Sequence, residues 1–142
     1  MRFARYEAHG EIAHGIVEDD TVRQITGFPY EAHEAIDHVH ALSGVRLLAP
    51  VLPGKIVAIG INYKSHLRDR EPPEFPEPFF KTASAVIGPE DAIVIPRAAI
   101  QQGVTMQPEA ELSVVIGRRC KNPARDDALD YVLGYTCGND VS

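Results

Sequence analysis

The clearest strand pattern in this chain is Pro108-Glu109-Ala110-Glu111-Leu112-Ser113-Val114-Val115-Ile116-Gly117. Because side chains alternate between the two faces of a strand, Glu109 and Glu111 are predicted to share one face, opposite the aliphatic residues. Two neighbouring carboxylates repel each other unless they face open water or a cation lies between them. The pair therefore predicts either two solvated glutamates on a half-exposed strand or part of a site for a hard cation such as Mg²⁺ or Mn²⁺.

A third acidic residue follows in a predicted neighbouring strand. The segment from Tyr131 to Asp140 has a strand pattern and comes after a short predicted helix over residues 126–130. Since ligands often converge where strands end, Asp140 is a candidate third carboxylate for the same site. The alternative is a turn residue, which is a common role for an Asn-Asp pair.

The rest of the chain reads mainly as short strands joined by turns, because it contains 11 Pro and 11 Gly. Strands are expected over residues 2–6, 15–18, 21–25, 55–60, 79–81 and 92–96, with residues 55–60 buried on both faces. Helices are expected over residues 30–42 and 62–70, and irregular structure over the proline-rich residues 71–78. This pattern predicts a β-rich α+β chain with a boundary near Pro53, which separates residues 1–52 from residues 53–142.

Composition and charge exclude several classes of protein. The chain has 14 Lys and Arg against 20 Asp and Glu, a net charge of −6, and its basic residues are scattered, which argues against a nucleic-acid partner. Cys120 and Cys137 lack the spacing of a zinc or disulfide framework. No apolar run approaches the ~20 residues of a membrane span, and the first residues lack a secretory signal. A soluble, cytoplasmic protein is expected.

Three further residues are candidates for catalysis. His66 and Asp69 are three residues apart in the predicted helix, so an acid can orient an imidazole for base work, although idle surface pairs share this spacing. Lys81 follows two aromatic residues at the end of a predicted strand. There it can neutralise a substrate carboxylate or enolate, or extend to solvent as an ordinary edge lysine.

Four segments together resemble, in order and spacing, the fumarylacetoacetate hydrolase family. They are residues 55–66 (KIVAIGINYKSH), 79–81 (FFK), 109–117 (EAELSVVIG) and 134–142 (GYTCGNDVS). Residues 1–50 also resemble the small N-terminal lobe of bacterial 2-hydroxyhepta-2,4-diene-1,7-dioate isomerases of that family. The resemblance implies a mixed β-roll enzyme, preceded by a small β-meander lobe, that forms a homodimer and binds Mg²⁺ or Mn²⁺.

The resemblance also assigns roles to individual residues. It implies that Glu109, Glu111 and Asp140 are the metal ligands and that His66 is the general base. Where many members have a glutamate three residues after that histidine, this chain has Asp69. Where some members have an additional Asp ligand before the histidine, this chain has Asn62, so a site of three carboxylates is expected.

The implied substrates are 2-oxo or β-diketo acids that react through a metal-stabilised enolate. Hydrolysis of a C–C bond and isomerisation are the preferred reactions, and decarboxylation or tautomerisation of oxaloacetate-like acids is the alternative. The sequence stops at Ser142, before the Ala-Arg-Asp segment with which the family motif continues, so a C-terminally truncated chain is expected. A second hypothesis is therefore a non-catalytic module for dimerisation or binding.

Overall fold

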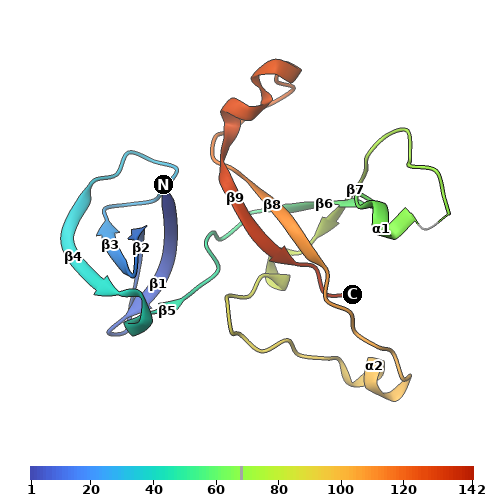
Figure 1. Cartoon of the computed structure of the whole chain (residues 1–142), viewed down its shortest axis with the longest axis horizontal. Coiled ribbons are helices and arrows are strands. Elements are labelled where there is room, and N and C mark those ends of the chain that lie inside the picture. Colours follow the sequence, from blue (N-terminus) through green and yellow to red (C-terminus); the bar gives the residue numbers. More distant parts are fainter. Residues whose placement is uncertain (68) are drawn as a thin grey trace. The chain divides into compact units, whose positions relative to one another are not determined.

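Antiparallel strands dominate the computed structural model, which describes residues 1–67 and 69–142 (Figure 1). The chain divides into two compact units, one made of Met1–Thr26 and Glu34–Asp91 and the other of Gly27–His33 and Ala92–Ser142. The strand-rich α+β class expected from the sequence is confirmed. In the described part of the chain, no helix is long and apolar enough to cross a membrane.

The first unit contains a five-stranded sheet with the order β4-β3-β2-β1-β5. Its strands are β1 (Arg2–Ala8), β2 (Glu11–Glu18), β3 (Thr21–Ile25), β4 (Ala35–Ala41) and β5 (Arg46–Leu47). The first three form the meander that the sequence predicts, and β2 starts four residues earlier than expected. Figure 1 shows that this sheet is strongly curved.

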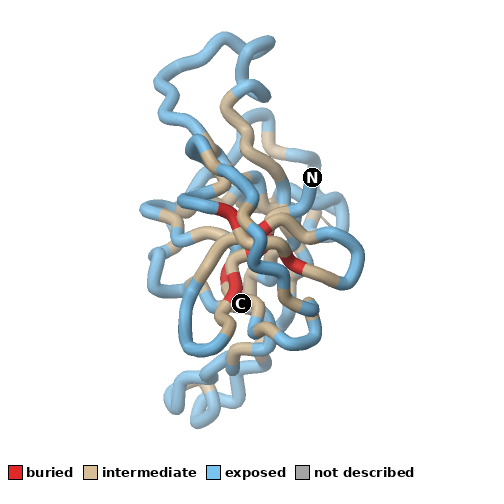
Figure 2. The backbone as a smooth tube through the Cα atoms, turned by 90° about the vertical axis from the view of Figure 1, so that its left-hand side faces the viewer, coloured by how far each residue is buried: buried red, intermediate tan, exposed pale blue. Residues whose placement is uncertain are grey.

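The core of the described residues lies inside this curved sheet. Tyr6 and Val22 are almost completely buried, at 1% and 0% exposure, and Ala4 packs with them. Figure 2 shows how few positions are buried elsewhere. The stability of the first unit therefore depends on a small cluster on β1 and β3.

The predicted helix over residues 30–42 is wrong. Residues 30–34 form a turn and irregular structure, and they are followed by strand β4 and a short 3₁₀ helix, η1 (Leu42–Gly44). Strand β4 pairs with β3 from Thr21↔Ala41 to Ile25↔Ala35, with an irregularity between Arg23 and Ile25. The edge of β3 has backbone N–H and C=O groups that need hydrogen-bond partners. A strand paired with this edge provides those partners, whereas a helix would leave them unbonded.

A second ladder in this unit joins β6 (Ile56–Gly60) to β7 (Glu77–Lys81) in antiparallel register. Between them, in the region of the helix predicted over residues 62–70, lies the turn α1 (Lys64–Leu67), and residue 68 lies outside the described residues. The 3₁₀ helix η2 (Ala83–Ala85) follows β7. The prediction that β6 is buried on both faces is wrong, because Val57 is 51% exposed and Ile59 37% exposed. Val57 and Ile59 lie on the same face, so this face of the ladder is open. Among the described residues β6 pairs with β7 alone, so its other edge has no partner strand there.

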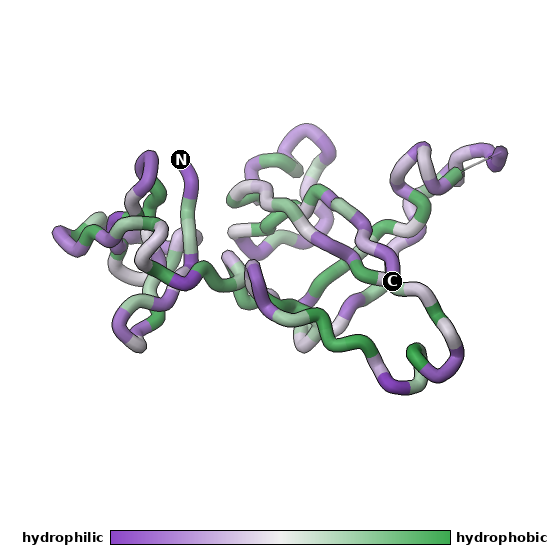
Figure 3. Tube along the Cα trace, turned by 60° about the horizontal axis from the view of Figure 1, so that its bottom comes forward, coloured by the Kyte–Doolittle hydropathy of each residue, from purple (hydrophilic) through white to green (hydrophobic). Residues whose placement is uncertain are grey.

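The second unit is built on one antiparallel pair, β8 (Ala110–Ile116) and β9 (Val132–Asn139). It also contains α2 (Arg97–Gln101) and η3 (Arg125–Tyr131), a 3₁₀ helix in the region where a short helix is predicted. The predicted strand over residues 92–96 is wrong, because this segment forms no strand. It is the hydrophobic run leading into α2 in Figure 3, and its Val94 is 83% exposed.

Candidate functional site

The β8–β9 ladder brings the three candidate metal ligands onto one face. Glu111 lies opposite Gly138, and Ala110 lies opposite Asn139. Beyond the strand ends the same register continues, because the Asp140 N–H donates to the Glu109 carbonyl at 2.9 Å. Since directly opposed residues share a face, Glu109, Glu111 and Asp140 point to the same side of this ladder.

Burial alternates along β8 as the sequence predicts. Glu109 and Glu111 are half-buried, whereas Leu112 is 65% exposed and Val114 49% exposed on the opposite face. Within the described residues neither glutamate belongs to an ion pair. Two half-buried carboxylates on one face repel each other and are partly removed from water. A cation bound between them would offset both of these costs.

Glu109 is held in place by its neighbours on the β9 side of the ladder. Its backbone N–H donates to Asn139 Oδ1 at 3.1 Å. The Ser142 hydroxyl donates to Glu109 Oε1 at 2.5 Å. Both the backbone and the carboxylate of this residue are therefore anchored.

Gly138 keeps the carboxylate face free of an additional side chain. A Cβ atom on Gly138 would lie 2.6 Å from Ser113 Oγ and 3.9 Å from the Glu111 Cβ. An alanine at this position would therefore require the Ser113 hydroxyl to move and would occupy space beside Glu111. The glycine leaves this space open on the face that carries the three acids.

The donor set fits a hard divalent cation by its chemistry. Carboxylate oxygens are the preferred ligands of Mg²⁺, and they also suit Mn²⁺. In the described residues, however, no group of three or more His, Cys, Asp or Glu side chains is arranged to hold a metal ion. Binding would require rotation of side chains on the face that Glu109, Glu111 and Asp140 already share.

His66 and Asp69 lie in the other unit and do not form a dyad in this structure. His66 is exposed on α1, and its backbone N–H donates to the Tyr63 carbonyl at 3.0 Å. The centroid of its ring is 6.3 Å from that of Tyr63. Within the described residues no hydrogen bond or ion pair joins His66 to Asp69. The assignment of these residues as base and orienting acid stays a prediction.

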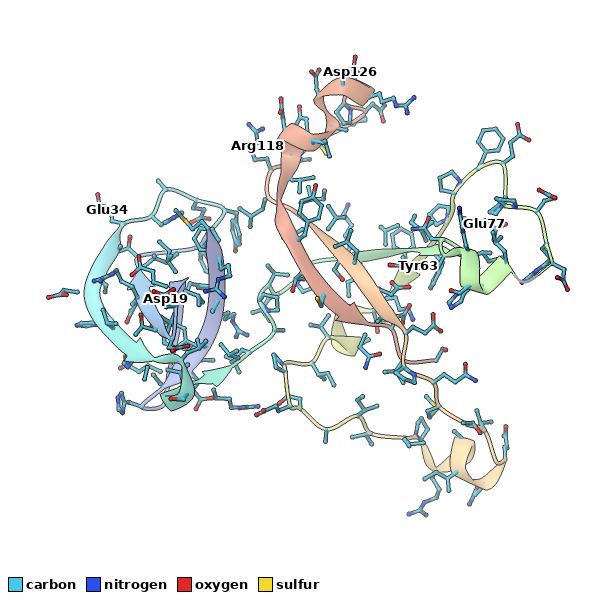
Figure 4. The ribbon with its side chains drawn as sticks, viewed as in Figure 1. Asp19, Glu34, Tyr63, Glu77, Arg118 and Asp126 are labelled. Carbon is cyan, nitrogen blue, oxygen red and sulfur yellow. The ribbon has the colours of Figure 1, made fainter. Side chains whose placement is uncertain are left out.

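Lys81 lies at the opposite end of the β6–β7 ladder from α1. Glu77, which pairs with Gly60, begins β7 near Tyr63, as Figure 4 shows, whereas Lys81 pairs with Ile56. Glu77 and Lys81 are four residue steps apart along the strand, about 13 Å at the usual rise. The Lys81 ammonium lies 5.6 Å from the centre of the Phe79 ring, a cation–π contact. This ladder therefore does not bring Lys81 to His66.

Comparison with known proteins identifies the family. Residues 55–142 match the family model described as fumarylacetoacetate (FAA) hydrolase C-terminal, and residues 1–50 match the model described as Rv2993c-like, N-terminal. The chain belongs to the fumarylacetoacetate hydrolase family. The resemblance noted from the four sequence segments is thereby confirmed.

Solved structures of this family share the fold of the chain. The 5-carboxymethyl-2-hydroxymuconate delta-isomerase from Mycobacterium smegmatis has 36% identity and a TM-score of 0.87, with 100% of this chain and 55% of that chain covered. A maleylpyruvate hydrolase from Sphingobium sp. SYK-6, solved with manganese(II) ion and pyruvate, has 28% identity and a TM-score of 0.73, with 99% and 58% covered.

A curated relative has a further activity. The oxaloacetate tautomerase fahd2, mitochondrial, of Xenopus laevis is 42% identical over 117 residues, which cover 78% of this chain and 35% of that protein. The chain spans about half the length of the first curated relatives that it matches, at 51% and 56%. Members of the fumarylacetoacetate hydrolase family are thus isomerases, hydrolases or tautomerases of small molecules.

Two residues that contact Glu109, Asn139 and Ser142, are not among those predicted from the sequence. Asn139 and Ser142 belong to the same Asn-Asp-Val-Ser stretch from which only Asp140 was selected. Their roles depend on cross-strand register, which brings them to Glu109 from 30 and 33 residues away in the chain. Their polar character was visible in the sequence, but their partner was not.

Proposed function

We propose that this chain is part of a metal-dependent enzyme that acts on 2-oxo or β-diketo acids through an enolate. The reaction is hydrolysis of a C–C bond or isomerisation of the 2-hydroxyhepta-2,4-diene-1,7-dioate type. The observation that carries the proposal is the placement of Glu109, Glu111 and Asp140 on one face of the β8–β9 ladder. The maleylpyruvate hydrolase relative supports it, because its structure contains both manganese(II) and pyruvate, a 2-oxo acid.

Under this proposal, Glu109, Glu111 and Asp140 hold Mg²⁺ or Mn²⁺. When bound, such a cation would supply positive charge to stabilise negative charge that develops on a 2-oxo acid. The three carboxylates are suited to hold it because all of them project from one face of the ladder. Gly138 provides the open space beside them.

The remaining predicted residues handle protons and substrate charge. His66 is the proposed general base, which removes a proton from water in hydrolysis or from carbon in isomerisation. Asp69 would orient its imidazole. Lys81 would neutralise a substrate carboxylate or the developing enolate, because an ammonium beside an aromatic ring is partly shielded from water.

A second candidate is tautomerisation or decarboxylation of oxaloacetate-like acids. The 42% identity to the Xenopus laevis oxaloacetate tautomerase favours it. The same enolate would serve both reactions, so the metal site is common to the two candidates. The need for a water-activating base distinguishes hydrolysis from decarboxylation, because only hydrolysis consumes water.

The decisive experiment measures Mg²⁺ and Mn²⁺ affinity by calorimetry together with turnover of acylpyruvates and oxaloacetate. Glu111→Gln should weaken metal binding at least about tenfold, because it removes one anionic ligand. The control Glu11→Gln changes an exposed glutamate on β2 and should leave affinity unchanged. Equal affinities for wild type and Glu111→Gln would refute the site.

His66→Ala separates hydrolysis from decarboxylation. Loss of a general base should lower acylpyruvate hydrolysis about 10²- to 10⁴-fold, while metal affinity and oxaloacetate decarboxylation change much less. His38→Ala, an exposed histidine on β4, is the matched control. Equal losses in both reactions would give His66 a different role, and metal binding without any turnover would favour the non-catalytic module.

A further inference from the structure

We propose that Ser142 and Asn139 are positioning residues that orient the Glu109 carboxylate, so that one of its oxygens is held by the protein and the other is left for the cation. This inference rests on the proposed metal site. It also distinguishes two of the three ligands. Hydrogen bonds from the protein orient Glu109 so that one carboxylate oxygen is left for the cation, whereas in the described part of the chain no such hydrogen bonds orient Glu111.

The direction of the Ser142 contact follows from chemistry. An ionised carboxylate can only accept hydrogen bonds, so the Ser142 hydroxyl is the donor to Glu109 Oε1 at 2.5 Å. Hydrogen bonds to a charged acceptor are short and stronger than neutral ones. Oε1 therefore already accepts a strong donor, which favours Oε2 as the oxygen that binds a metal.

The Ser142 hydroxyl is presented from an anchored backbone. The Ser142 carbonyl accepts from the Gln107 N–H at 2.8 Å, and the Ser142 N–H donates to the Gln107 carbonyl at 3.1 Å. This pair extends the β8–β9 register past both strands and places Ser142 on the face of Glu109 and Asp140. The contact to Glu109 thus comes from a paired residue.

Asn139 fixes the backbone of the same ligand. In a regular antiparallel pair, Glu109 and Asp140 would exchange both of their backbone hydrogen bonds. Here the Asp140 N–H reaches the Glu109 carbonyl at 2.9 Å, but the Glu109 N–H turns to Asn139 Oδ1 at 3.1 Å. The side chain of Asn139 therefore replaces a ladder bond at the residue that carries the ligand.

Glu111 provides the contrast within the same face. It lies opposite Gly138, which has no side chain to offer, and among the described residues no hydrogen bond to the Glu111 carboxylate is found. Partners that orient metal ligands typically change affinity 10- to 100-fold when they are removed. Glu109 should show such a dependence on its neighbours.

The test is calorimetric titration of the full chain with MnCl₂. Ser142→Ala should weaken Mn²⁺ binding about tenfold, whereas Ser142→Thr, which keeps the hydroxyl, should stay within about twofold of wild type. Asn139→Ala should also weaken binding. Ser43→Ala, an exposed serine in η1, is the control, and thermal melting without metal shows that each variant is folded.

A double-mutant cycle identifies the route of the effect. In a Glu109→Gln background, Ser142→Ala should cause no further loss of Mn²⁺ affinity, because its only contribution acts through that carboxylate. A full additional tenfold loss in that background would overturn the positioning role. So would unchanged affinity in Ser142→Ala alone, provided that Glu111→Gln still weakens binding. If wild type itself fails to bind Mn²⁺, the proposed metal site fails, and the inference fails with it.

Discussion

Backbone crowding at single residues sets firm limits on this fold. Gly15 is buried in the middle of β2, where a Cβ atom would lie 2.6 Å from both the Arg23 carbonyl oxygen and Val22 Cγ2. One of these atoms is backbone in a paired strand, and the other belongs to a fully buried side chain. Neither can move without disturbing the small core on which the first unit depends.

Gly15→Ala should therefore destabilise the chain by about 1–3 kcal/mol, the usual cost of overpacking a core. The free energy of unfolding from urea titration measures this effect. Gly44→Ala is the matched control, because a Cβ at Gly44 meets nothing within 4 Å. Equal stabilities of the two variants would show that β2 and β3 can separate enough to admit a methyl group.

Ile61 is a second residue with a strong local constraint. Its φ of 51° places a β-branched side chain in the left-handed region, immediately after β6 and shortly before α1. Such a conformation is a genuine outlier for isoleucine, and residues of this kind cluster at functional sites. Its position between β6 and the α1 turn that carries His66 is consistent with that tendency.

At the scale of elements, an ionic link connects three segments of the first unit. Arg46 on β5 contacts Glu7 on β1 at 3.4 Å and Asp91 at 2.7 Å. Asp91 Oδ2 also accepts the Gly88 N–H at 2.8 Å. The loop before Asp91 is thus tied to the edge of the five-stranded sheet by a carboxylate with two kinds of partner.

This arrangement predicts a defined acid dependence. The Gly88 N–H, followed by the Arg46 guanidinium, lowers the pKa of Asp91 below its usual value of 3.8. Folding favours the ionised Asp91 carboxylate. Its contribution to stability is therefore complete above the usual pKa of 3.8 and is lost as the pH falls through the lowered pKa of the folded chain.

Asp91→Asn should therefore reduce stability at neutral pH and flatten the loss of stability on acidification below about pH 4. Unfolding free energies measured from pH 7 to pH 2 test this, with the exposed turn residue Asp20 changed to Asn as control. Because the ion pair is largely exposed, added salt should diminish the difference between wild type and variant. Parallel pH profiles for wild type and Asp91→Asn would contradict the role of this link.

At the scale of the whole molecule, large apolar side chains are exposed on the strands that carry the site. On the face of the β8–β9 ladder opposite the acids, Leu112 is 65% exposed and Tyr135 is 59% exposed. On the β6–β7 ladder, Phe80 is 78% exposed. Exposed apolar faces of this kind favour association.

The chain is therefore predicted to self-associate, with a homodimer as the expected state. Light scattering after size exclusion should give about twice the 15.6 kDa of the chain. Leu112→Lys should shift the equilibrium toward monomer, whereas Glu11→Lys on β2 should not. A monomer at all concentrations would contradict the prediction.

The local sequence pattern is sufficient to predict the strands in which polar and apolar side chains alternate. The strands β1, β3, β8 and β9 lie within a few residues of their predicted positions, and the acidic and aliphatic faces of β8 are those expected. Alternation is a property of a strand by itself, so these features need no knowledge of the partner. Alternation also predicts that Glu109 and Glu111 share a face, whereas the sequence suggests Asp140 only by its place at the end of a strand.

The remaining features depend on which segments pair, and pairing is a property of the folded chain. Residues 35–41 became a strand because the edge of β3 was open to them, while residues 92–96 found no strand partner in spite of a better strand composition. The same cause places Lys81 away from α1 and brings Asn139 and Ser142 to Glu109. Backbone hydrogen bonds between distant residues decide these outcomes, because each strand is stable only with a partner, and local sequence does not encode which partner that is.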